Sequence, residues 1–82
     1  MKNYIFRIVI EPDEKNTFHG YVPSLPGCHT WGETIIRTKE NLREAIKCHL
    51  QGLLKDGESI PQENERFELI QTFTEKEIIP TQ

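Results

Sequence analysis

Cysteine and histidine stand side by side twice in this chain, as Cys28-His29 and Cys48-His49. These residue types can bind zinc, or supply a nucleophile and its base. Adjacent residues on a strand point to opposite faces, and neighbours on a helix differ by about 100° in direction, so neither pair converges on one metal. The chain also lacks C-x-x-C and H-x-x-x-H spacings. We therefore predict no metal, no cofactor and no catalytic cysteine, with both thiols serving in packing.

The two cysteines also indicate in which cellular compartment the protein is expected. The N-terminus has no signal-peptide pattern, and the longest apolar run is far too short to span a membrane. Free thiols in a reducing cytoplasm are the simplest interpretation, and a Cys28–Cys48 disulfide is the less favoured alternative. The net charge of −3 argues against general nucleic-acid binding and favours a basic partner.

The spacing of apolar residues predicts the elements that hold these side chains. Residues 3–11 alternate as a strand, residues 12–16 form a polar loop, and residues 17–22 and 27–31 are two further strands. A helical period runs over residues 35–55, between Thr34 as N-cap and Gly57 as C-cap. Residues 66–73 alternate again as a last strand. One apolar face of the first strand should pack on the helix; it carries Tyr4, Phe6, Ile8 and Ile10.

This order predicts an α+β fold: a three-stranded antiparallel sheet followed by one long helix and a fourth strand, in two layers. Residues 1–74 are expected to form a single domain, with residues 75–82 as a C-terminal tail. The stretch between residues 21 and 34 is the corner of this fold. Its prolines and glycines indicate tight turns between strands and helix.

The corner also resembles a known family. The matching residues are Tyr21-x-Pro23-x-Leu25-Pro26-Gly27-Cys28-x-Thr30-x-Gly32-x-Thr34, then Asn41-Leu42-Arg43-Glu44-Ala45-Ile46, Gly52-Leu53-Leu54 and Gly57-Glu58-x-Ile60-Pro61. Together they resemble the HicB antitoxins over about residues 4–61. The resemblance implies a partial RNase H-like domain with the order strand-strand-strand-helix-strand, which agrees with the periodicity.

The resemblance implies a function as well. It implies an antitoxin of a type II toxin–antitoxin system that binds a HicA-type mRNA-cleaving toxin and covers its active site. Longer members add a DNA-binding domain; this chain stops after the last predicted strand, so DNA binding is not expected. Nuclease activity is not expected either, because only Glu11 and Asp13 lie near the strands and a two-metal site needs a cluster of carboxylates. The alternative is an orphan RNA- or protein-interaction module with the same fold and no toxin.

Three apolar residues are candidates for partner binding: Tyr21, Trp31 and Ile36. Tyr21 lies on the strand face opposite Phe18 and Val22. Trp31 is either a lid on the core, which we favour because aromatic side chains bury large areas, or an exposed anchor. Ile36 falls off the helix stripe and would form an apolar patch with an exposed Trp31. Self-association into a homodimer or larger homo-oligomer is also expected, because a small sheet leaves edges to cover.

Two histidines complete the candidates. His19 and His29 are expected to be neighbours across two strands. A hydrogen-bonded surface pair is favoured over a proton relay at this position.

Overall fold

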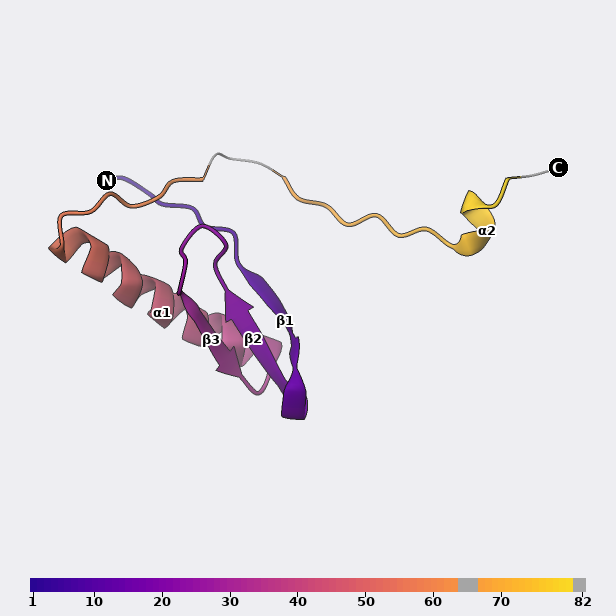
Figure 1. Cartoon of the computed structure of the whole chain (residues 1–82), viewed down its shortest axis with the longest axis horizontal. Coiled ribbons are helices and arrows are strands. Elements are labelled where there is room, and N and C mark those ends of the chain that lie inside the picture. Colours follow the sequence, from indigo (N-terminus) through magenta and orange to yellow (C-terminus); the bar gives the residue numbers. More distant parts are fainter. Residues whose placement is uncertain (64–66, 81–82) are drawn as a thin grey trace.

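The computed structural model describes residues 1–63 and 67–80. Three strands, β1 (Val9–Asp13), β2 (Thr17–Tyr21) and β3 (His29–Gly32), form an antiparallel sheet in the order β1-β2-β3. The long helix α1 (Ile35–Lys55) packs across one face of this sheet, and a short helix α2 (Glu75–Ile78) lies far from it (Figure 1). The prediction of an α+β fold with a three-stranded antiparallel sheet and one long helix is confirmed.

The first hairpin is tighter than the predicted loop. Its turn is a short 3-10 segment over Glu14–Asn16, in which Lys15 and Asn16 adopt left-handed φ angles of 62° and 60°. The Asp13 carboxylate accepts a hydrogen bond from the Glu14 N–H at 2.8 Å and so closes the turn. The ladder with β2 begins at Val9, which pairs with Tyr21, so residues 3–8 of the predicted strand precede it.

Two glycines let the helix approach the sheet. A Cβ atom on Gly20 would lie 2.9 Å from Thr38 Cγ2, and one on Gly32 would lie 2.6 Å from Thr38 N. Thr38 is fully buried at this contact, and its hydroxyl donates to the Thr34 carbonyl at 2.7 Å. Side chains of α1, Thr38 and Leu42, thus lie closest to Gly20.

The corner between β2 and β3 is part of the core. The buried apolar residues of the core are Val22, Leu25 and Cys28 from the corner and Leu42 from α1. Backbone hydrogen bonds fold the corner inward, from Leu25 N to Val22 O and from Cys28 N to Leu25 O, both at 3.0 Å. Burial raises the pKa of the Cys28 thiol. Both cysteines are free, and only Cys28 is buried, so the predicted packing role is confirmed for Cys28 and is wrong for the exposed Cys48.

Both ends of α1 agree with the sequence. The Thr34 hydroxyl accepts a hydrogen bond from the Arg37 N–H at 2.9 Å. At the other end Gly57 has a φ of 72°, and the Glu58 N–H donates to the Leu53 carbonyl at 2.8 Å. This is the glycine-capped end in which two otherwise unpaired carbonyls gain donors.

Replacing the helix N-cap gives a first testable expectation. Thr34→Ala should lower the free energy of unfolding by about 1 kcal/mol, because the Arg37 N–H loses its acceptor. Thr74→Ala is the matched control: Thr74 caps the short α2 with a hydrogen bond to Glu77 N at 3.4 Å, outside the sheet-and-helix body. Urea unfolding followed by helical circular dichroism measures both variants, and an equal loss in the two would contradict the assignment.

The predicted fourth strand, over residues 66–73, is not seen among the described residues. Residue 66 lies outside the described residues, and residues 67–73 have no strand partner in the described part of the chain. Instead, residues 67–79 extend away from the body as an arm that ends in α2 (Figure 1). The alternating pattern was sufficient to suggest a strand, but a strand needs a neighbour to pair with.

Candidate protein-interaction surfaces

Four ring side chains cover the face of the sheet that lies opposite α1. His19 and Tyr21 alternate on β2, and the register places Trp31 opposite His19 and His29 opposite Tyr21. The His19 ring lies 5.5 Å from Tyr21, 5.3 Å from His29 and 4.9 Å from Trp31, between ring centroids. We call this cluster of His19, Tyr21, His29 and Trp31 the aromatic face.

The two histidines of this face contact each other directly. His19 Nε2 lies 3.1 Å from His29 Nδ1, a distance that allows a hydrogen bond when one nitrogen donates and the other accepts. The predicted cross-strand neighbourhood is confirmed, with the two residues diagonal in the register rather than directly opposite. Their rings thereby hold the cluster together across β2 and β3.

A carboxylate borders the aromatic face on β1. Asp13 Oδ2 accepts a hydrogen bond from the Trp31 indole N–H at 2.7 Å. The backbone N–H of Glu14, and then the Trp31 indole, hold the pKa of Asp13 below its ordinary value. Glu11 lies two residues earlier on the same face of β1 and opposite His19, so the border carries two acidic side chains.

Trp31 is not the lid of the core. Its side chain is 48% exposed, so the favoured prediction of a core lid is wrong, and the alternative of an anchor for a partner stays a prediction. The reason is parity: Gly32, the next residue, faces Thr38 on the helix, so Trp31 must face the other way. Beside the aromatic face lies a shallow hollow of about 320 Å³, between Tyr21, His29 and the corner residues Pro23 and Pro26.

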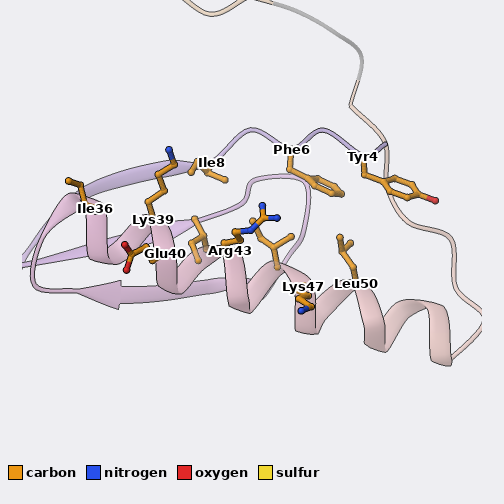
Figure 2. Close-up of a pocket in the computed structure, with 11 residues that line it drawn as sticks. Tyr4, Phe6, Ile8, Ile36, Lys39, Glu40, Arg43, Lys47 and Leu50 are labelled. Atoms are coloured by element: carbon orange, nitrogen blue, oxygen red, sulfur yellow. The ribbon is translucent and has the colours of Figure 1, made fainter. Parts of the chain in front are cut away.

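A second surface is a groove between residues 4–8 and α1, with a volume of about 630 Å³. Tyr4, Phe6 and Ile8 line one side, as the alternation predicted, and helix residues line the other (Figure 2). We call this surface the helix groove. It is lined by Tyr4, Phe6, Ile8, Ile36, Lys39, Glu40, Leu42, Arg43, Ile46, Lys47 and Leu50.

The three candidate residues therefore divide between two surfaces. Tyr21 and Trp31 meet on the aromatic face through His19. Ile36 is exposed, as predicted, but it lies in the helix groove on the side of the sheet where α1 packs. The sequence could have placed His19 and His29 with Tyr21 and Trp31 from strand alternation alone.

Glu63 is a residue that the sequence gave no reason to single out. Its carboxylate accepts hydrogen bonds from the Arg7 N–H at 2.7 Å and from the Ser24 hydroxyl at 3.1 Å. It thus fastens the segment after α1 to the N-terminal segment and to the corner. Arg7 also forms an ion pair with Glu68, at 2.8 Å. The hydrogen bonds of Glu63 to Arg7 and Ser24 span 56 and 39 residues of chain, so no local sequence pattern reveals them.

We call the hydrogen bonds of Glu63 to Arg7 and Ser24 the Glu63 clamp. The clamp makes the stability of the domain depend on pH. The Arg7 N–H, and then Ser24, stabilise the ionised form and hold the pKa of Glu63 below its ordinary value of 4.5. Its contribution is therefore complete above pH 4.5 and is lost as the pH falls through the lowered value. In the wild type, the free energy of unfolding should fall as the pH is lowered from about 5 to about 3, and in Glu63→Gln this fall should be smaller. Exposed Glu58→Gln is the matched control, and the same flattening in both would contradict the clamp.

Neither a metal site nor a membrane-spanning helix is found among the described residues. Among residues 1–63 and 67–80, no group of three or more histidine, cysteine or acidic side chains is arranged to hold a metal ion. Within the same part of the chain, no helix combines the length and apolar character that crossing a membrane requires.

Comparison with known proteins identifies the family. A family model described as the HicB-like antitoxin of bacterial toxin–antitoxin systems matches residues 6–79. A UPF0150 protein of Thermoplasma acidophilum is 37% identical over 59 residues, covering 72% of this chain and 86% of that protein. A UPF0150 protein of Archaeoglobus fulgidus is 44% identical over 57 residues, covering 67% of this chain and 83% of that protein.

Solved structures agree. The crystal structure of the N-terminal domain of the Burkholderia pseudomallei antitoxin HicB superposes with a TM-score of 0.65 at 36% identity, covering 74% of this chain and 72% of that one. A chain of a HicA3–HicB3 toxin–antitoxin complex shares the fold, with a TM-score of 0.62 at 24% identity, covering 76% of this chain and 72% of that one. The chain belongs to the HicB-like antitoxin family of bacterial toxin–antitoxin systems.

Proposed function

We propose that this protein is a type II antitoxin that neutralises a HicA-type mRNA-cleaving toxin by covering the toxin's active site. Membership of the HicB-like antitoxin family supports the role. One structural relative comes from a HicA3–HicB3 complex, which is why a HicA-type toxin is the partner that we propose. Inhibition by coverage needs no catalytic group, so we propose that the protein acts without enzymatic activity.

The observation that carries this proposal is the composition of the aromatic face. Tyrosine and tryptophan are among the residues most enriched in binding hot spots. Here both contact the His19 ring on one face of the sheet, Trp31 exposed and Tyr21 half-buried. Glu11 and Asp13 add negative charge at their border. A toxin that binds RNA must present a positively charged surface, which an acidic and aromatic face complements. The aromatic face is therefore the toxin-binding surface that we propose, with Tyr21 and Trp31 as its anchors.

The remaining partners and the architecture follow from the same proposal. We propose a homodimer, a cytoplasmic location, and neither DNA nor a membrane as partner. We also propose that residues 67–73 supply the fourth strand of a partial RNase H-like domain once they are paired. The domain boundary between residues 74 and 75, and Ile36 as a toxin contact, stay predictions.

A second candidate function is an orphan RNA-binding module, and one observation favours it. Exposed rings that lie close together can stack on unpaired bases. The carboxylates of Glu11 and Asp13 oppose this use, because they repel the phosphate backbone. The antitoxin is the better account, since the same carboxylates favour a basic protein.

Co-expression with a HicA-type toxin encoded beside this protein tests the proposal. We expect the chain to restore growth and to elute with the toxin as a stable complex from a sizing column. A catalytically inactive variant of the toxin should still bind, because coverage does not require the reaction. Growth arrest together with absence of a complex would overturn the proposal. Salt-dependent binding of single-stranded RNA by the pure protein would then favour the second candidate.

A further inference from the structure

The free face of the sheet combines aromatic rings and carboxylates with no permanently positive side chain. None of the strands β1, β2 and β3 contains lysine or arginine. Glu11 and Asp13 lie on the same face as the four rings, because Glu11 pairs with His19 and Asp13 with Thr17 across the ladder. Electron-rich ring faces and carboxylates attract the same kind of ligand, a cation. The aromatic face is therefore suited to a positive charge that its own strands do not supply.

Glu11 is the carboxylate with its full capacity for such a ligand. Its side chain is exposed, and among residues 1–63 and 67–80 no hydrogen bond or ion pair engages its carboxylate. Asp13, in contrast, already accepts hydrogen bonds from the Glu14 N–H and the Trp31 indole. An ionised carboxylate can accept two parallel N–H bonds from one guanidinium group. Glu11 is thus placed to receive both.

Trp31 offers a fixed ring beside this carboxylate. Asp13 lies on β1 and Trp31 on β3, so the indole reaches across β2 to make its 2.7 Å hydrogen bond. The His19 ring supports it, with 4.9 Å between the ring centroids and 30° between the planes. The Trp31 side chain nevertheless stays 48% exposed. A ring that is already held in place loses little freedom when a ligand binds, and its bond to a carboxylate makes the ring more attractive to a cation.

The geometry favours arginine over lysine as the source of the cation. A guanidinium is planar, so it can stack on an indole while its N–H groups pair with a carboxylate, whereas an ammonium is a compact point charge. The hollow beside the aromatic face begins at Tyr21 and His29, about 7 Å along the strands from His19 and Trp31. An extended arginine side chain covers about the same distance. Its hydrocarbon stem can therefore lie over Tyr21, towards the corner prolines that line the hollow.

We propose that the aromatic face is a guanidinium-binding site, and that it holds one arginine side chain of the toxin in the complex. The guanidinium stacks on Trp31 and donates hydrogen bonds to the Glu11 carboxylate, while the stem of the arginine lies over Tyr21. Glu11 then determines the specificity of the surface for arginine. The identity of the partner rests on the proposed function, whereas the chemistry of the site does not.

Fluorescence of the full-length chain tests the site without a toxin, because Trp31 is the only tryptophan in the sequence. The probes are blocked tripeptides of glycine, a variable residue and glycine, in which the variable residue is arginine, citrulline or lysine. Citrulline keeps the shape of arginine without its charge, and lysine keeps the charge without the planar group. At constant ionic strength, the arginine peptide should reach half of its effect at a concentration at least about threefold lower than either of the others.

Glu11→Gln should raise this concentration about threefold, because the amide keeps the shape of the side chain and loses its charge. Glu58→Gln is the matched control: it removes the same charge from an exposed position beyond the end of α1 and should change nothing. Both substitutions are exposed and nearly isosteric, so the helical circular dichroism should stay that of the wild type. Equal responses to the three peptides, no response to any, or equal losses in the two variants would overturn the proposal.

The toxin then identifies the occupant. Each arginine of a catalytically inactive HicA-type toxin is replaced in turn by lysine, and the affinities for the wild type and for Glu11→Gln are measured by isothermal titration. One replacement should weaken binding to the wild type about tenfold, and binding to Glu11→Gln less than about threefold. If no arginine behaves in this way, the toxin does not place one on the aromatic face and the proposal is wrong. If the toxin binds neither protein, the proposed function fails, and the peptide titrations alone decide the guanidinium site.

Discussion

Adding a single methyl group at Gly32 should destabilise the domain by about 3 kcal/mol. A Cβ atom there would lie 2.6 Å from both the backbone nitrogen and the hydroxyl oxygen of Thr38. Real Cβ contacts are not this short, so β3 and the first turn of α1 would have to move apart. Thr38 cannot yield by rotating, because its backbone is part of the collision and it is fully buried. Overpacking against rigid backbone usually costs 1–3 kcal/mol, and this site belongs at the upper end.

Gly52→Ala is the matched control for this experiment. Gly52 lies inside α1, and beyond its chain neighbours and the adjoining helix backbone no atom lies within 4 Å of the position where its Cβ would be. The same methyl group should therefore stabilise the protein by about 0.5–1 kcal/mol, since alanine favours helix more than glycine does. Urea unfolding at fixed protein concentration measures both, because a dimer makes apparent stability depend on concentration. A change of the same sign in both variants would contradict the packing at Gly32.

Local signals in the sequence predicted the body of the fold well. The bounds of α1 follow from Thr34 and Gly57, whose caps depend only on residues within one turn. The two-residue period gave β2 and β3 to within two residues, because alternation reports which side chains face the helix. The predicted first strand, in contrast, began six residues before β1 does. The resemblance to HicB antitoxins was readable from the corner, where the turn residues are most specific.

Long-range relations were not predictable in the same way. Residues 67–73 have the pattern of a strand, but the pattern cannot say on which chain the neighbouring strand lies. Glu63 carries no local signature, since its hydrogen bonds reach Arg7 and Ser24 across most of the chain. Trp31 was misplaced because size was weighed above parity: one residue further on, Gly32 already indicated which face meets the helix.

The candidate residues lie on two separate surfaces of one small protein. The aromatic face lies on the free side of the sheet, whereas the helix groove lies on the side that α1 covers. A partner on one surface does not exclude a partner on the other.

The second large effect is expected at the aromatic face. Trp31→Ala and Tyr21→Ala should each weaken toxin binding by about 30-fold or more, because aromatic anchors at the centre of an interface are worth roughly 2 kcal/mol or more each. The Trp31 substitution should be the stronger, since it also releases the Asp13 carboxylate from the indole N–H. Neither side chain belongs to the buried core, so the unfolding free energy should change by less than about 1 kcal/mol.

Leu54→Ala is the control that makes the result specific to the aromatic face. Leu54 is 63% exposed near the far end of α1 and lies outside both the aromatic face and the helix groove, so its loss should leave toxin affinity unchanged. Ile36→Ala then decides whether the groove also contacts the toxin: a loss smaller than that at Trp31 assigns Ile36 a minor role there. Isothermal titration of each variant into a catalytically inactive toxin measures the affinities. Unchanged binding by both Trp31→Ala and Tyr21→Ala would place the toxin elsewhere, because no interface centred on these rings could lose them without cost.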